Sequence, residues 1–245
     1  MNSAGAREPL DVPAAWRGRE LLGRPDWQIT LEAKEIDELL KAIQPVLESG
    51  RPWQETSKSD YQMPSLARRL AGIQRDLELG SGSTIVKGLP VDVLDEEQAA
   101  CAFWAMMCHV GTAVSQTAEG QQFFHVRDEG FRVGQAQARG PNTRNRLSFH
   151  TDRCDVIAFL CLQQALRGGE NQLVSSVTLY NEILRRRPDL LEVLMQPLLY
   201  KRHNVDRGNT LPYCRQPVFS FCEGHFAGCF LRVLIERAHQ SEDAP

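Results

Sequence analysis

The chain has 245 residues, of which 42% are hydrophobic and 24% charged, a composition typical of a globular domain and not of a disordered chain. Its formal net charge of -3, with no basic patch, gives no electrostatic reason to expect a nucleic acid or an acidic membrane as partner. The N-terminal residues lack a secretory signal pattern, no apolar run could span a bilayer, and the seven cysteines contain no Cys-x-x-Cys pair. These features predict a cytoplasmic protein with reduced thiols.

The first half of the chain predicts helices separated by loops. Residues 1–24 are rich in Ala, Gly, Pro and Arg without periodicity, which predicts a flexible arm before one domain over residues 25–245. Apolar residues at helical spacing predict three helices: one capped by Thr30 and running through Leu47, one from Leu66 to Leu77 closed by Gly80, and one begun by an Asp95 and Gln98 capping box. We expect Phe103, Met107 and Val110 on the buried face of the third helix.

Two short strands and a long loop are predicted before the central motif. The strands cover Thr84 to Lys87 and Gln122 to Arg127, and the loop covers Arg127 to Arg146. Arg144 and Arg146 could meet an anionic substrate in that loop, although a solvated surface is the simpler interpretation.

The stretch from Leu147 to Thr178 carries nearly all the chemistry that the sequence shows. His150 and Asp152 stand two residues apart, so a strand would project an imidazole and a carboxylate to the same face. Two histidines and one carboxylate on one octahedral face suit a non-haem Fe(II) that handles O2. The motif therefore predicts two of three metal ligands, although a chance His-x-Asp is expected on the order of a third of the time.

The residues that follow predict two strands and then helices. Val156 to Leu162 is an unbroken apolar run, which predicts a strand buried on both faces. A turn at Gly168-Gly169 and a strand from Gln172 to Ser176 come next, with Thr178 as a helix cap. Downstream we expect a helix ending at Arg186, a second helix begun by Pro188, and a hairpin from Pro217 to Phe230 around Glu223-Gly224.

The order of the segments LSFHTD, FLCLQQA and GGENQLVSS, followed by a helix ending RRRPDLLEVL, resembles the taurine dioxygenase-like (TauD/TfdA-like) family of Fe(II)- and 2-oxoglutarate-dependent oxygenases. The likeness runs from about Gly82 to Ile235. It implies an α+β fold with a mainly β core, a double-stranded β-helix (jelly roll) with flanking helices. It also implies Fe(II) and 2-oxoglutarate as cofactors, His150 and Asp152 as iron ligands, and O2 and a small organic molecule as reactants. The family's hydroxyl residue that hydrogen-bonds 2-oxoglutarate falls at Asn171, whose amide can donate a similar bond.

Two further family residues have no counterpart here. Members continue into strands that carry a distal His and an Arg that pairs with the far carboxylate of 2-oxoglutarate, so we expect a C-terminally incomplete fold. His203, His225 and His239 lie downstream, in segments that the resemblance places away from the metal, and His225 is the best placed of them to substitute. His109 and His125 have no partner at ligand spacing, so we assign neither to the site.

Three functional hypotheses remain at this point. The first is a 2-oxoglutarate-dependent dioxygenase, and the second is a truncated, inactive remnant or weak metal-binding fragment whose uncovered strands would favour self-association. The third is a metal-free, cupin-like binding module, which would make His150-Thr151-Asp152 an accident. The absent His and Arg favour the second, so we expect this chain alone not to turn over 2-oxoglutarate at a rate typical of an enzyme.

Overall fold

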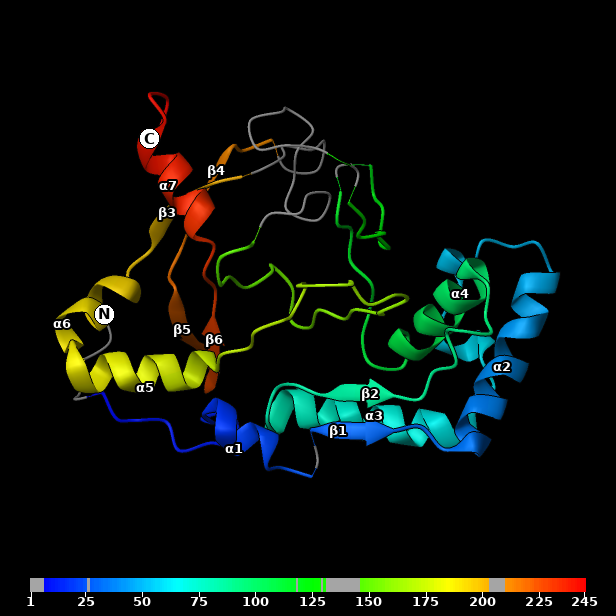
Figure 1. Ribbon diagram of the computed structural model, residues 1–245. Coiled ribbons are helices and arrows are strands. Elements are labelled where there is room, and N and C mark those ends of the chain that lie inside the picture. The colour runs from blue at the N-terminus through cyan, green and yellow to red at the C-terminus, as the bar shows by residue number, and fades with distance from the viewer. Residues whose placement is uncertain (1–6, 26, 118, 129, 131–145, 203–209) are drawn as a thin grey trace. The chain divides into compact units, whose positions relative to one another are not determined.

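The structure is a computed structural model that describes residues 7–25, 27–117, 119–128, 130, 146–202 and 210–245 (Figure 1). The chain forms two compact units. Unit 1 comprises Met1–Ala113, Cys154–Met195 and Phe219–Gly228, and unit 2 comprises Val114–Arg153, Gln196–Val218 and Cys229–Pro245. The predicted mixture of helices and strands is confirmed. In the described parts of the chain the strands pair into three two-stranded sheets, so the double-stranded β-helix stays a prediction.

Three helices form the first part of unit 1, as the apolar spacing predicts. They are α2 (Ala33–Glu48), α3 (Pro64–Leu79) and α4 (Glu96–Met107). The 3-10 turns η1 (Trp53–Glu55) and η2 (Lys58–Asp60) lie between α2 and α3. Helix α2 contacts both α3 and α4. Leu39, Leu66 and Leu70 are fully buried between these helices, and Trp53 meets Trp104 edge to face with ring centroids 5.7 Å apart. These contacts make a hydrophobic core between the three helices.

The ends and faces of these helices differ in detail from the prediction. Helix α2 is capped by Glu32 and not by Thr30, whereas α3 ends at Gly80 and α4 begins at the Asp95 and Gln98 capping box, as predicted. In α4 the most buried side chains are small or sulfur-containing apart from Trp104, and Phe103 and Met107 are only half-buried. Because alanines leave room for close helix packing, the buried face follows side-chain size as well as hydrophobicity.

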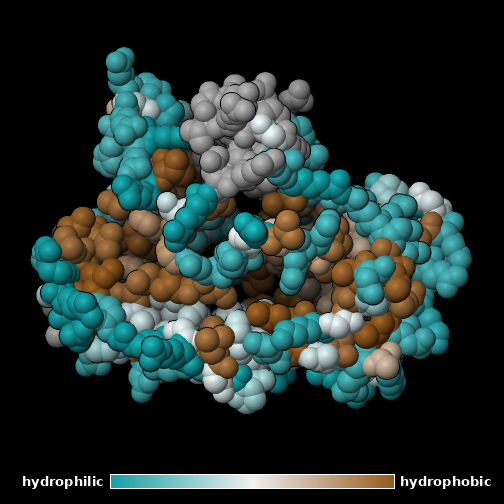
Figure 2. All heavy atoms as spheres, viewed as in Figure 1, coloured by the Kyte–Doolittle hydropathy of each residue, from teal (hydrophilic) through white to brown (hydrophobic). Residues whose placement is uncertain are grey.

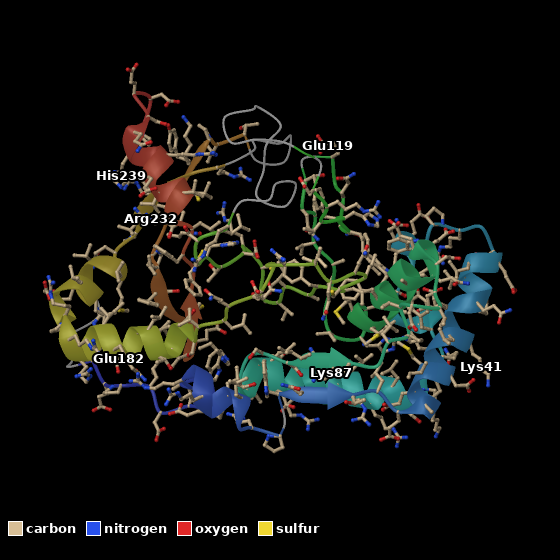
Figure 3. All side chains as sticks on the ribbon, in the orientation of Figure 1. Lys41, Lys87, Glu119, Glu182, Arg232 and His239 are labelled. Carbon is tan, nitrogen blue, oxygen red and sulfur yellow. The ribbon has the colours of Figure 1, made fainter. Side chains whose placement is uncertain are left out.

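The N-terminal segment also contributes to the core of unit 1. Residues 7–24, for which the sequence predicts a flexible arm, include α1 (Gly18–Leu22), and Trp16 and Leu21 are buried in one cluster with Trp27. The Trp16 indole donates a hydrogen bond to the Ser81 carbonyl at 2.8 Å. Strands β1 (Gln28–Thr30) and β2 (Ile85–Lys87) pair in parallel, and Lys87 (Figure 3) donates to the Gln28 side chain at 2.6 Å.

A second part of unit 1 consists of α5 (Ser176–Arg186), α6 (Pro188–Leu194) and the hairpin of β5 (Phe219–Cys222) and β6 (His225–Gly228). The Tyr180 ring of α5 packs edge to face against three phenylalanine rings of the hairpin, Phe219, Phe221 and Phe226. Glu223 and Gly224 have φ of 50° and 85°, the left-handed conformation that a tight hairpin turn requires, which confirms the predicted turn. Figure 2 shows hydrophobic side chains at the surface of α5 and α6. Leu190 and Val193 of α6 are 43% and 53% exposed.

Unit 2 is built on a hairpin and a helix. Strand β3 (Leu198–Lys201) pairs antiparallel with β4 (Tyr213–Gln216), and α7 (Arg232–Gln240), whose first turn carries Arg232 and last turn His239, packs against β3 (Figure 3). Tyr200, Leu234 and Ala238 are almost completely buried at this contact.

Three predicted strands are wrong. Residues 122–127 and 156–162 have no strand assignment, and neither do residues 172–175. Helix α5 begins at Ser176, directly after its cap Ser175, so Ser175 and not Thr178 is the cap. The side chains of Val156, Ile157 and Phe159 are 42%, 49% and 70% exposed. An apolar run becomes a buried strand only where a second strand pairs with its backbone and other side chains cover its faces. Hydrophobicity alone therefore misassigned this run.

Among the residues that the structure describes, no helix has both the length and the apolar character needed to cross a bilayer.

Candidate functional site

The two predicted metal ligands lie together in unit 2 on an exposed stretch without regular secondary structure. His150 and Asp152 are both exposed, and the strand expected to carry them is absent. Thr151 between them is half-buried. The three residues therefore differ in environment, and the middle one faces the protein.

Thr151 is held by two hydrogen bonds to one residue. Its backbone N–H donates to the Phe230 carbonyl oxygen at 2.9 Å, and its side-chain Oγ1 accepts from the Phe230 N–H at 2.9 Å. Phe230 stands two residues before α7. The pair of bonds, which we call the Thr151 clip, joins segments 79 residues apart in the sequence.

A second contact lies on the other side of Asp152. The Arg153 guanidinium donates to the Cys214 sulfur of β4 at 3.2 Å. Thr151 and Arg153 thus both reach the scaffold of unit 2, while His150 and Asp152 between and beside them stay exposed.

One ring nitrogen of His150 is already engaged. Its Nδ1 lies 2.7 Å from the carbonyl oxygen of Ser148. Because a carbonyl oxygen can only accept, Nδ1 carries the proton in this hydrogen bond and the neutral ring leaves the lone pair of Nε2 available. Histidines that bind metals commonly have their second nitrogen fixed by a backbone carbonyl in this way.

The Asp152 carboxylate meets no hydrogen-bond or ion-pair partner in the described part of the chain. Carboxylate oxygens and imidazole nitrogens are both ligands of divalent first-row metals. Neither unit, over its described residues, brings a group of three His, Cys, Asp or Glu side chains to one point. His150 and Asp152 therefore supply two donors of suitable chemistry, and a third donor is not assigned.

Tyr200 belongs to β3, which packs against α7. Its side chain is fully buried, and its hydroxyl donates to the Cys229 carbonyl at 3.1 Å, one residue before Phe230. Burial, which disfavours the charged phenolate, raises the pKa of Tyr200 to about 12. The residue next to Phe230 is thus held by a buried, hydrogen-bonded side chain.

The predicted cofactor residue Asn171 lies in unit 1 and is exposed. Gly168 and Gly169 before it have φ of 77° and 78°, so the predicted glycine turn is present. The strand expected after the turn is absent. Since Asn171 and the two ligands belong to different units, the approach of its amide to them stays a prediction.

The other histidines occupy varied positions. His225 begins β6 in unit 1, His239 lies in α7, His109 Nδ1 contacts the Ala105 carbonyl at 3.0 Å, and the His125 ring meets Phe123 edge to face. His203 and Arg144 lie outside the described residues, and Arg146 is exposed.

Sequence reasoning missed the Thr151 clip and the Ser148 contact to His150. Both involve backbone atoms, which every residue possesses, so neither leaves a signal in side-chain type or spacing. A threonine between two candidate ligands was the only available indication.

Comparison with known proteins gives two kinds of match. The family model of "Taurine catabolism dioxygenase TauD, TfdA family" matches residues 47–234. The FR-33289 synthase of Streptomyces rubellomurinus is 25% identical over 222 residues, which cover 90% of this chain and 66% of that protein. The taurine hydroxylase-like protein SAT17 of Stachybotrys chartarum is 25% identical over 198 residues, which cover 78% of this chain and 51% of that protein. The chain thus spans between half and two thirds of the length of these relatives.

We predict that Tyr200 links stability to alkaline pH. Its pKa is raised above the unfolded value near 10, so its contribution is complete below about pH 10 and is lost as pH rises towards 12. The free energy of unfolding, measured with urea between pH 9 and 12, should fall less steeply in Tyr200→Phe than in the wild type. Equal slopes in the two proteins would contradict a buried phenol at this position.

Proposed function

Because this chain belongs to the taurine catabolism dioxygenase TauD, TfdA family, we propose that it binds Fe(II) through His150 and Asp152 as part of a 2-oxoglutarate-dependent dioxygenase acting on a small organic substrate. One observation carries the proposal. The imidazole and the carboxylate are exposed on either side of Thr151, which is itself fixed to the scaffold by two hydrogen bonds. The fold proposed around this site is the family's double-stranded β-helix.

The two side chains fit the proposed metal in donor chemistry. The Ser148 carbonyl fixes the proton of His150 on Nδ1, which leaves Nε2 to bind the metal. Asp152 has no partner to displace among the described residues. Bound Fe(II), with 2-oxoglutarate and O2, would supply the oxidising chemistry, and the protein would supply ligands, orientation and exclusion of water.

Asn171 is proposed to bind 2-oxoglutarate. Its side-chain amide can donate a hydrogen bond to a carboxylate, as the family's hydroxyl residue does. The left-handed glycines at 168 and 169 turn the chain immediately before it, and its exposed side chain is accessible to a ligand.

A second candidate function is metal binding without turnover. It is favoured by the two-donor set, because the described residues of each unit provide no third donor beside His150 and Asp152. The two candidates share the metal site and differ in whether 2-oxoglutarate is consumed.

We predict that metal affinity depends on both assigned ligands. His150→Ala and Asp152→Ala should each abolish measurable Mn(II) binding, followed by the electron paramagnetic resonance signal of free Mn(II), because one remaining donor is too few for a site. His239→Ala and Asp155→Ala are matched controls that remove an imidazole and a nearby carboxylate, and they should bind as the wild type does. Unchanged affinity in both His150→Ala and Asp152→Ala would show that the site is wrongly assigned, and a loss in His225→Ala would make His225 a ligand.

For Asn171 we expect an effect on the cofactor and not on the metal. Asn171→Ala should weaken 2-oxoglutarate binding to the Mn(II)-loaded protein by about tenfold or more, the usual consequence of losing a hydrogen bond to a charged group. Isothermal titration with 2-oxoglutarate measures the change, and Mn(II) affinity serves as the control. A variant that binds 2-oxoglutarate as well as the wild type does would remove Asn171 from the site.

Succinate formation separates the two candidate functions. With Fe(II), ascorbate, O2 and 2-oxoglutarate, we expect succinate release by the 245-residue chain to stay at the level of Asp152→Ala, because the described residues supply only two ligands for the metal, which would hold it weakly. Release well above that level, lost in both His150→Ala and Asp152→Ala, would show that a residue of this chain completes the site and that the chain is itself a dioxygenase.

A further inference from the structure

The residues from His150 to Arg153 alternate in what they contact. Thr151 binds the Phe230 backbone and Arg153 binds the Cys214 sulfur, and both partners belong to the same unit. His150 and Asp152 are exposed, and the His150 ring contacts the nearby Ser148 carbonyl. Arg153 is exposed as well, so Thr151 is the half-buried anchor of this segment, and it stands between the two exposed candidate ligands.

From this alternation we propose that Thr151 is a positioning residue, which holds His150 and Asp152 in the relative orientation that a metal requires. The inference rests on the proposed metal site. Its mechanism is the Thr151 clip. The hydroxyl accepts the Phe230 N–H while the Thr151 N–H donates to the Phe230 carbonyl, so Thr151 is fixed between the two ligands through its backbone N–H and its side-chain hydroxyl.

The partner of the clip is itself held by its neighbours in the chain. Phe230 follows Cys229, whose carbonyl accepts the buried Tyr200 hydroxyl and whose N–H donates to the Val218 carbonyl at 2.8 Å. Phe230 also precedes α7, which buries Leu234 and Ala238. Because Thr151 is bonded to this backbone, the chain on which His150 and Asp152 stand has less conformational freedom.

Two variants isolate the hydroxyl. Thr151→Val keeps the branched shape and removes the acceptor, whereas Thr151→Ser keeps the acceptor. Thr178→Val is a matched control, because Thr178 is also half-buried and its hydroxyl binds a distant backbone carbonyl, that of Trp16 at 2.7 Å, in unit 1. The measurements are Mn(II) affinity and the hydrogen–deuterium exchange rate of the Phe230 amide.

We expect Thr151→Val to weaken Mn(II) binding by about tenfold, in the range found when a residue that orients a metal ligand is removed. The Phe230 amide should exchange slowly in the wild type and faster in Thr151→Val. Thr151→Ser should restore both properties, and Thr178→Val should change neither.

Other results would overturn the inference. A Thr151→Val protein that exchanges faster at Phe230 but binds Mn(II) normally would make the clip purely structural. A Thr151→Ser protein as weak as Thr151→Val would show that the hydroxyl is not responsible. Rapid exchange of Phe230 in the wild type would show that the clip is absent, even if Thr151→Val failed to fold. A wrongly assigned metal site would give a different result: His150→Ala and Asp152→Ala would both bind Mn(II) as the wild type does.

Discussion

The paired hydrogen bonds between Thr151 and Phe230 are the constraint on which the candidate site depends. Each bond contributes about 1 kcal/mol net, which is small beside the cost of fixing an exposed chain. The larger stabilisation comes from the packing of α7 on β3, where Tyr200 and Ala238 are fully buried. This packing holds the backbone to which Thr151 bonds. The orientation of His150 and Asp152 thus depends on the Thr151 clip, and the clip depends on the apolar packing that holds Phe230.

The helices could be predicted because their determinants are local. Apolar periodicity located α2 and α3, the Asp95 capping box located the start of α4, and Pro188 located α6. The β5–β6 hairpin could be predicted as well, because the pair Glu223-Gly224 indicates its turn. Each of these signals depends only on neighbouring residues, so it can be recognised in one sequence.

The strand predicted at Thr84 to Lys87 is present as β2, but three other predicted strands are absent, because a strand is defined by its partner. Val156 to Leu162 has the composition of a buried strand, yet its side chains apart from Leu160 are exposed and its backbone has no strand assignment. The same limit applies to the site. His150 and Asp152 were found from a local pattern, whereas the Thr151 clip depends on a backbone 79 residues away, and Asn171 was connected to them only through a family resemblance.

The family assignment and the geometry support the same interpretation from different directions. Residues 47–234 match the family, and this range contains His150, Thr151, Asp152 and Phe230 together. The most direct test of the central claim, that a metal binds at His150 and Asp152, is the loss of amide signals near added Mn(II) in a nitrogen–proton NMR spectrum. We expect substoichiometric Mn(II) to broaden the amides of His150 to Arg153 and of Phe230 first, and Asp152→Ala to prevent this. Broadening that begins elsewhere, or that persists in Asp152→Ala, would contradict it.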